Sequence, residues 1–194
     1  MSQIDLRRRP LVAALLKDAP DLLVVAGLGS AAWDITAAGD RDLNFPLWGA
    51  MGGAVSVGLG LALAQPNRRI VVVTGDGEML MGLTALTTIA AMAPRNLAVL
   101  VLDNETYGET GGQRTNTARG TDLAAMAKAA GIGRSWTVTK ESDADDALRR
   151  VREDKGPLFC VAKVRFEELP LVLPPKDGVI LRERLRKALG VAAD

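Results

Sequence analysis

Two polar residues that follow apolar runs are the clearest candidates for chemistry in this chain. Asp76 lies in the triplet Gly75-Asp76-Gly77, directly after the run IVVVT at 70–74, and Asn104 follows the run LAVLVL at 97–102. Both runs have the length and composition of buried parallel strands. If the strands are parallel, Asp76 and Asn104 emerge at the same edge of the sheet, where ligands bind in open α/β sheets. A carboxylate and an amide oxygen suit Mg²⁺, which completes its shell with water and phosphate oxygens. The pair therefore indicates a Mg²⁺–diphosphate site, although Asp76 alone could be a turn residue that caps the next helix.

The amino-acid composition excludes several kinds of catalytic and metal-binding site. Histidine is absent and Cys160 is the single cysteine. These counts exclude His-based triads, His metal sites, an internal disulfide and a Cys-rich zinc or iron–sulfur site. The formal net charge of +1, from 24 basic and 23 acidic residues, gives no sign of a nucleic-acid surface. Catalysis must therefore come from carboxylates, amides, hydroxyls, backbone groups or a bound cofactor.

Strands that alternate with helices must position these residues. The sequence predicts an α/β fold, with residues 1–194 as one doubly wound domain that has a mostly parallel sheet and helices on both faces. The expected strands are 22–26, 70–74, 97–102, 158–164 and, more weakly, 135–138, with Cys160 in the core. The expected helices are 30–38, 51–64, 82–92, 122–130, 142–152 and 178–189.

The uncharged segment 45–65 is nearly as long as a membrane span. It contains Pro46 and five glycines, so we expect a buried Gly-rich loop and helix instead. The N-terminal apolar stretch 11–16 is too short for a secretory signal, because Lys17 and Asp18 interrupt it. We therefore expect a cytoplasmic protein.

The triplet at 75–77, followed after 26 residues by Asn104, resembles the motif of the thiamin-diphosphate enzymes, GDG followed by NN after about 25 residues. One position departs from the motif, because Asp103 stands where the first Asn is usual. The resemblance implies a Mg²⁺ ion held by the side chains of Asp76 and Asn104 and by the backbone carbonyl of Thr106. It also implies that the diphosphate is cradled by residues of two loops, namely Gly75, Gly77, Glu78, Thr106, Tyr107 and Gly108.

The resemblance extends upstream. The segment Gly-Ala-Met-Gly-Gly-Ala at 49–54 resembles the loop that supports the bent, V-shaped cofactor. Met51 would wedge between the two rings, and the Gly49 carbonyl would accept a hydrogen bond from the aminopyrimidine. Without the resemblance, Met51 is a core methionine at a helix start. The turn at 27–30 opens a helix and would offer Gly29 and Ser30 to a phosphate, although Ser30 is also a good N-cap.

Thiamin-diphosphate enzymes place the cofactor between two domains, of which this chain resembles the diphosphate-binding one. The other domain binds the aminopyrimidine and supplies an activating Glu, and Glu78 lies on the metal side and is a poor candidate for it. The resemblance therefore implies a partner, a pyrimidine-binding (α) subunit, and a hetero-oligomer with shared active sites. Such an enzyme would use the cofactor to release CO₂ and an aldehyde from a 2-oxo acid.

The segment 104–115 resembles the sulfopyruvate and phosphonopyruvate decarboxylase branch, and this chain would be its β subunit. Thr110 and Gln113 would be substrate contacts, whereas Glu109 and Arg114 stand at variable positions. An acid at 109 would not help to bind a doubly anionic substrate. Three alternatives remain open: a carboligase of the acetolactate synthase type, a 2-oxo-acid:ferredoxin oxidoreductase β subunit, and a non-catalytic cofactor-binding module.

Overall fold

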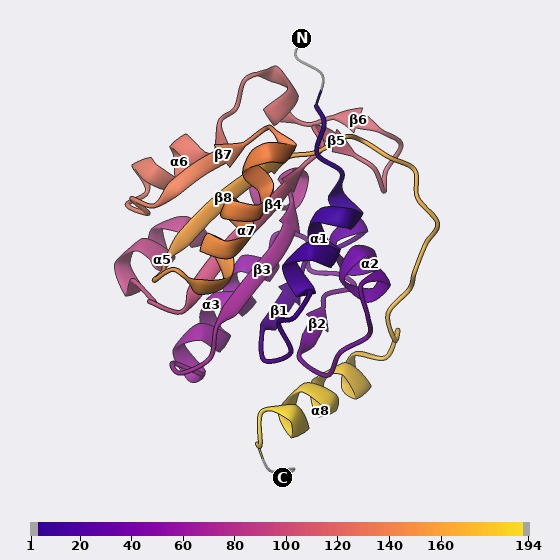
Figure 1. The fold of residues 1–194 in the computed structure, drawn as a ribbon, viewed down its shortest axis with the longest axis vertical. Coiled ribbons are helices and arrows are strands. Elements are labelled where there is room, and N and C mark those ends of the chain that lie inside the picture. The colour runs from indigo at the N-terminus through magenta and orange to yellow at the C-terminus, as the bar shows by residue number, and fades with distance from the viewer. Residues whose placement is uncertain (1–3, 192–194) are drawn as a thin grey trace.

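Six parallel strands form the centre of the molecule. A computed structural model describes residues 4–191 and places the strands in the order β2-β1-β3-β4-β8-β7 (Figure 1). Their bounds are β1 Leu23–Ala26, β2 Asn44–Pro46, β3 Ile70–Gly75, β4 Leu97–Asp103, β7 Ser135–Val138 and β8 Leu158–Lys163. All five strand pairings in this sheet are parallel, so the predicted sheet is confirmed.

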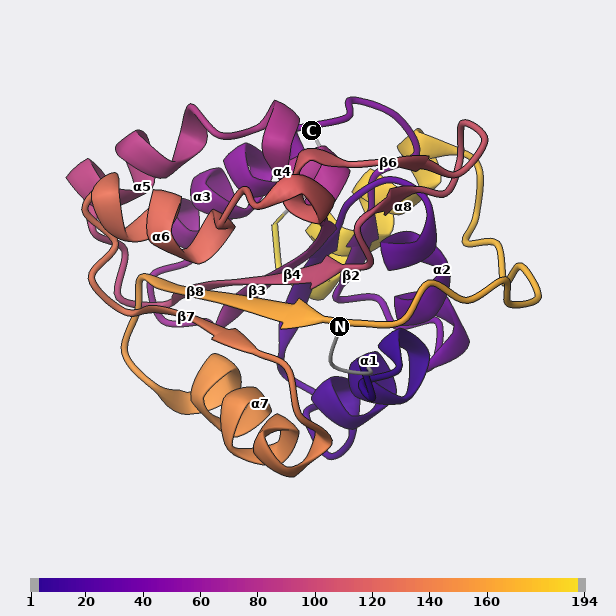
Figure 2. The ribbon, with the colours of Figure 1, turned by 90° about the horizontal axis from the view of Figure 1, so that it is seen from above.

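Helices cover both faces of the sheet, as predicted (Figure 2). On one face lie α1 (Arg8–Leu16), α2 (Ser30–Ala37) and α7 (Ala144–Glu153), which pack on Val71 and Val73 of the central strand. On the other lie α3 (Ala54–Ala64), α5 (Ala85–Met92) and α6 (Leu123–Ala129), which pack on Ile70 and Val72. Because successive side chains of a strand point to opposite faces, a strand buried on both faces is apolar throughout.

The uncharged segment 45–65 folds as part of β2, a loop and helix α3. A Cβ atom on Gly58 would lie only 2.2 Å from Cγ2 of Val72, so the helix backbone packs directly against β3. The expected loop and helix are present, but the expectation that the loop is buried was wrong: Gly49 and Ala50 are exposed and residues 51–53 are half-buried, because the loop lies at the rim of the sheet. None of the helices within residues 4–191 is long and apolar enough to cross a membrane.

Several elements differ from the sequence-based prediction. The helix expected at 51–64 begins at Ala54, and the one expected at 142–152 begins at Ala144 after a 3₁₀ turn, η2 (Glu141–Asp143). A short helix α4 (Asp76–Met81), which was not predicted, follows β3 directly. The helix expected at 82–92 is shorter than predicted and corresponds to α5 (Ala85–Met92). Elements that were not predicted are α1, β2, the 3₁₀ turn η1 (Asn116–Arg119) and a hairpin of β5 (Thr106–Tyr107) and β6 (Gln113–Arg114).

The chain reverses direction across the sheet between β1 and β3. After β1 it passes to the edge strand β2, then returns across β1 to β3 and continues to β4. A crevice opens at the carboxyl ends of strands at such a switch point. After β8, residues 164–177 run along the outside of the molecule to helix α8 (Gly178–Ala188) beside β2 (Figure 1). We call residues 164–177 the strap.

Candidate functional site

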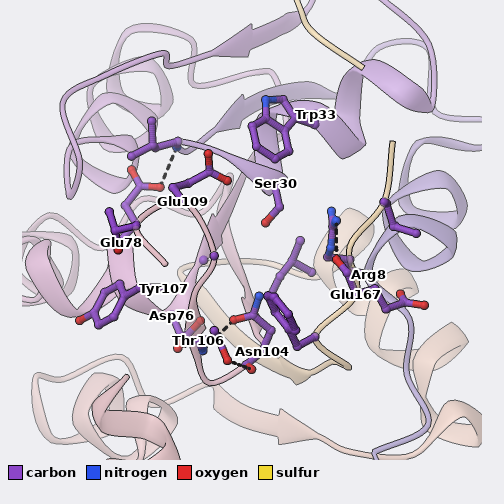
Figure 3. A pocket seen from close by; sticks show the side chains of 18 of the residues that line it. Arg8, Ser30, Trp33, Asp76, Glu78, Asn104, Thr106, Tyr107, Glu109 and Glu167 are labelled. Carbon is purple, nitrogen blue, oxygen red and sulfur yellow. Dashed lines mark hydrogen bonds between the residues drawn. The ribbon is translucent and has the colours of Figure 1, made fainter. Parts of the chain in front are cut away.

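A cavity of about 410 Å³ lies at the carboxyl ends of the central strands (Figure 3). Loops after β1, β3 and β4 line it, together with Met51, Arg8 and part of the strap. Of the residues expected at the site, those that line the cavity are Ser30, Met51, Gly75, Asp76, Gly77, Glu78, Asn104, Thr106, Tyr107, Gly108 and Thr110. Parallel register brings the ends of β3 and β4 together, which places Asp76 and Asn104 in one cavity as the sequence predicted.

Asp76 is a buried carboxylate held by two hydroxyl groups. Thr115 and Thr117 both donate to its Oδ2 atom, at 2.5 and 3.1 Å, so Oδ1 takes neither hydroxyl. Burial and, to a smaller extent, the negative charge of Asp103 raise the pKa of Asp76 to about 6, against the hydrogen bonds from Thr115 and Thr117, which lower it. Burial destabilises the charged form of this carboxylate, so a cation beside Asp76 would stabilise that form.

Asp103, at the position where the motif has Asn, has a partner for its charge. Its Oδ2 atom lies 2.8 Å from Nζ of Lys163, and its Oδ1 atom accepts hydrogen bonds from the Thr117 hydroxyl (2.8 Å) and the Glu105 amide (3.1 Å). Lys163 also pairs with Glu105 at 2.9 Å. The carboxylate at 103 is therefore neutralised within this chain, and it does not compete for a cation at Asp76.

Asn104 is oriented by a tight turn. Its Oδ1 atom accepts a hydrogen bond of 2.9 Å from the amide of Thr106, and Glu105 between them has the left-handed φ of 61°. This side-chain turn fixes the amide oxygen at the end of β4, and an amide oxygen has a second lone pair for a metal ion. Asp76 and Asn104 thus bring two hard oxygen donors to one cavity, and the Thr106 carbonyl stays a predicted third ligand.

The Glu78 carboxylate joins three segments below the cavity. Its Oε2 atom accepts hydrogen bonds from the Leu28 amide (3.0 Å) and the Thr74 hydroxyl (2.9 Å). A Cβ atom on Gly27 would lie 1.6 Å from the same oxygen, so only glycine leaves room for it. Burial raises the pKa of Glu78 above its ordinary value, while the Thr74 hydrogen bond opposes this. Glu78 therefore fastens the turn after β1 to helix α4.

The loop at 49–53 reaches the cavity through Met51. Gly52 adopts a φ of 88°, and a Cβ atom on Gly82 would lie 2.5 Å from the Gly52 carbonyl oxygen. The loop is thus packed against the end of α4 and holds Met51 at the cavity wall. Gly49, expected beside Met51, does not line the cavity.

The hairpin tip beyond Tyr107 holds the residues expected to contact substrate. Thr110 lines the cavity, whereas Gln113 is exposed and bonds back to Thr110, with its Nε2 atom 2.8 Å from the Thr110 carbonyl. Glu109 lines the cavity and packs over Gly29, which itself lies outside the lining. Arg114 points away and pairs with Glu105 at 2.9 Å.

Several lining residues were not expected from the sequence: Arg8, Leu28, Trp33, Leu102, Glu109 and, from the strap, Phe166, Glu167, Glu168, Leu169 and Leu171. None belongs to a spaced motif. The run Arg7-Arg8-Arg9 was visible as a local charge, but no pattern linked it to a cavity more than 60 residues away along the chain.

Comparison with known proteins decides the family. The family model described as thiamine pyrophosphate enzyme, C-terminal TPP binding domain, matches residues 30–162. The chain belongs to this family. The expected resemblance is thereby confirmed, and thiamin diphosphate is the cofactor that this domain binds in the family.

Relatives of the TPP binding domain include enzymes of two lengths. Sulfopyruvate decarboxylase subunit beta of Methanothermobacter thermautotrophicus is 45% identical over 174 residues, which are 90% of this chain and 90% of that protein. Phosphonopyruvate decarboxylase of Streptomyces viridochromogenes is 43% identical over 163 residues, which are 84% of this chain but only 41% of that protein. The chain therefore matches nine-tenths of the first relative and less than half of the second.

A solved structure shows the same fold. Benzoylformate decarboxylase from Polynucleobacter necessarius superposes with a TM-score of 0.71 at 21% identity, over 88% of this chain and 35% of that one. The likeness extends the sequence match to the fold of the TPP binding domain.

The residues of the cavity fit the family's cofactor. Within residues 4–191 no cluster of three or more Asp, Glu, His or Cys side chains could hold a metal alone. Asp76 and Asn104 thus suit a cation that takes its other ligands from water and diphosphate oxygens. The buried Glu78 Oε1 atom, which lacks a hydrogen-bond partner among the described residues, is a further polar atom beside the cavity.

Proposed function

We propose that this chain is the diphosphate- and Mg²⁺-binding (β) subunit of a split thiamin-diphosphate-dependent 2-oxo-acid decarboxylase. The substrate would be sulfopyruvate, phosphonopyruvate or a similar 2-oxo acid, and the products CO₂ and an aldehyde. The observation that carries the proposal is the placement of Asp76 and Asn104 at the ends of the adjacent parallel strands β3 and β4, in one cavity. Relatives of the same length are named as β subunits of sulfopyruvate decarboxylase, which supports the split arrangement.

The proposal assigns a role to the residues that the motifs identify in and beside the cavity. Asp76, Asn104 and the Thr106 carbonyl hold the Mg²⁺ ion, and the loop at 106–108 with Gly77 and Glu78 encloses the diphosphate. Gly29 and Ser30 add contacts from the turn after β1. Met51 supports the bent conformation of the cofactor, with the Gly49 carbonyl beside it. When bound, the cofactor would act as the electron sink for the negative charge that loss of CO₂ leaves on the substrate's former carbonyl carbon.

The chain's own residues would bind, orient and keep the site dry. Glu78 is not free to act as the Glu that activates the aminopyrimidine, because its carboxylate is held by the Leu28 amide and the Thr74 hydroxyl. We infer that a pyrimidine-binding (α) subunit supplies that Glu and closes the open side of the cavity. The active complex is then a hetero-oligomer with shared sites.

A related function keeps the cofactor and changes the reaction. The large subunit of acetolactate synthase from Cyanidium caldarium is 27% identical over 143 residues, which are 67% of this chain. A carboligase of that type would use the same cavity. Its identity is lower than that of the decarboxylases, which is why we favour decarboxylation.

The test is co-purification of the chain with the product of an adjacent gene, followed by a screen of 2-oxo acids for aldehyde release. The complex should release aldehyde from one or more of them only with thiamin diphosphate and Mg²⁺, and the single chain should release none. Turnover by the pure single chain would refute the split site. Formation of a longer 2-oxo or hydroxy acid in place of an aldehyde would favour the carboligase.

A further inference from the structure

Two segments outside the matched residues 30–162 return to the cavity. One is the start of α1, through Arg8, and the other is the strap, through residues such as Phe166 and Leu171. Arg8 is only 3% exposed although it lines the cavity. It is the one basic side chain among the described lining residues, whereas five lining residues are acidic: Asp76, Glu78, Glu109, Glu167 and Glu168.

The Arg8 guanidinium is fixed at both ends. Its Nη1 atom pairs with Oδ2 of Asp34, which is fully buried, and its Nη2 atom donates to the Glu167 carbonyl at 3.3 Å. Arg9 pairs with the other oxygen of Asp34 at 2.8 Å. A planar group held in this way is preorganised to present its remaining N–H donors in one direction.

The charges of this cluster do not cancel. Asp34 carries one negative charge and pairs with both Arg8 and Arg9, so the three residues together have a net charge of +1. The field of Arg8 reaches across the cavity to Glu109: burial raises the pKa of Glu109, and the charge of Arg8 lowers it. Asp34, the carboxylate partner of Arg8, is shared with Arg9, so its single negative charge does not fully offset the two guanidinium groups beside the cavity.

The neighbours of Arg8 indicate which anion it would bind. Arg8, Ser30 and Asn104 surround one part of the cavity, and Asp76 lies beside Asn104 (Figure 3). These are the residues to which the proposed function assigns the diphosphate and its metal ion. A guanidinium matches phosphate oxygens in geometry and charge.

We propose that Arg8 binds the diphosphate of thiamin diphosphate, as a contact from outside the segment 30–162 that the family model matches. The inference rests on the proposed function, and it makes Asp34 the positioning residue for Arg8. The strap shares this arrangement, because Arg7 pairs with Glu167 at 2.8 Å and Arg9 donates to the Pro170 carbonyl at 2.9 Å. The N-terminal arginines thus hold the wall of the cavity, but only Arg8 faces the ligand.

The test compares Arg8→Gln with Arg9→Gln. Both variants lose one guanidinium partner of Asp34, but Arg9 does not line the cavity. Calorimetry on the complex of the full chain with its α subunit, in the presence of Mg²⁺, measures the affinity for thiamin diphosphate and for thiamin. Arg8→Gln should weaken thiamin diphosphate roughly 10- to 100-fold, since a hydrogen bond between charged groups is lost, and should leave thiamin unchanged. Arg9→Gln should change both affinities less than about threefold.

Arg8→Lys keeps the positive charge beside Asp34 and serves as a second variant if Arg8→Gln does not fold. The affinity of Arg8→Lys for thiamin diphosphate should lie between the affinities of wild type and of Arg8→Gln. Equal weakening by Arg8→Gln and Arg9→Gln, or an unchanged affinity in Arg8→Lys and Arg8→Gln, would overturn the assignment. A raised KM for the 2-oxo acid in the complex with unchanged cofactor affinity would also overturn it, since Arg8 would then bind substrate. If wild type binds no thiamin diphosphate, the proposed function itself fails.

Discussion

Asp103 and Lys163 stand directly opposite one another in the register of β4 and β8, and their side chains form an ion pair of 2.8 Å. Asp103 is the one departure from the cofactor motif, and it is buried. An extra carboxylate near Asp76 would be costly without a partner. The departure is thus matched by a lysine on the neighbouring strand, and the metal-binding pair Asp76 and Asn104 is kept.

This relationship predicts a compensating pair of substitutions. Lys163→Met should lower the free energy of unfolding by about 1–3 kcal/mol, because it leaves a buried carboxylate without its cation. Asp103→Asn should restore most of the loss in the double variant. Urea unfolding of the two single variants and the double variant measures the coupling. Additive losses would show that the two side chains act independently.

Asp76 should make the cofactor-free protein less stable as the pH rises. Its pKa of about 6 in the folded chain exceeds the ordinary value of 3.8, so the folded state binds the proton more tightly than the unfolded state. Stability from this group is therefore present below pH 4 and is lost as the pH rises to about 6. Without metal, Asp76→Asn should be more stable than wild type at pH 7.5, by on the order of 1–3 kcal/mol.

The same substitution separates stability from function. Asp76→Asn should abolish Mg²⁺-dependent binding of thiamin diphosphate, as measured by calorimetry, because the metal loses its carboxylate. Denaturant unfolding of wild type and Asp76→Asn at pH 4 and pH 7.5 measures the effect on stability. A variant that is no more stable than wild type at either pH would refute the assigned cost of the buried charge.

The effect of a substitution at Gly27 on stability should depend on whether Glu78 is present. Gly27→Ala places a Cβ atom where the Glu78 carboxylate lies, so it should break the bonds to Leu28 and Thr74 and cost about 1–3 kcal/mol. In a Glu78→Ala background the space is vacant, and the same change should cost much less. Thermal unfolding of the four proteins of the cycle tests this, and equal costs in both backgrounds would contradict the contact.

Met51 should matter more to turnover than to binding. Met51→Ala should lower kcat of the complex roughly 10- to 100-fold, because the cofactor loses the support of its reactive geometry. The Kd for thiamin diphosphate should change less than about threefold, and Met51→Leu should retain most activity as the matched control. A silent Met51→Ala variant would leave Met51 a packing residue.

The sequence was sufficient for the elements whose pattern is local. Continuous apolar runs predicted β1, β3, β4 and β8, because strands buried on both faces need apolar side chains on both. The GDG and Asn104 spacing predicted one end of the cavity, since parallel register alone brings those two strand ends together. Helix α4 was missed because its first residues, Asp76 and Gly77, are those of a turn.

The other wall of the cavity could not be predicted in this way. Arg8 and Glu167 meet across 159 positions of sequence, and neither stands in a periodic or spaced pattern. Gln113 stays a predicted substrate contact, and its motif position gave no sign that its side chain bonds to Thr110 within the hairpin tip. Long-range contacts of charged side chains are decided by packing that a one-dimensional pattern does not contain.

The ties between the N-terminal arginines and the strap have a consequence for synthesis on the ribosome. Arg7 and Arg9 find their partners Glu167 and Pro170 only after some 160 further residues have been translated. The sheet strands β1, β3 and β4 can pair long before then, whereas this side of the cavity closes last. The core itself is completed only by β8 (Leu158–Lys163), so a nascent chain would finish its sheet and this wall of the cavity within a few residues of one another.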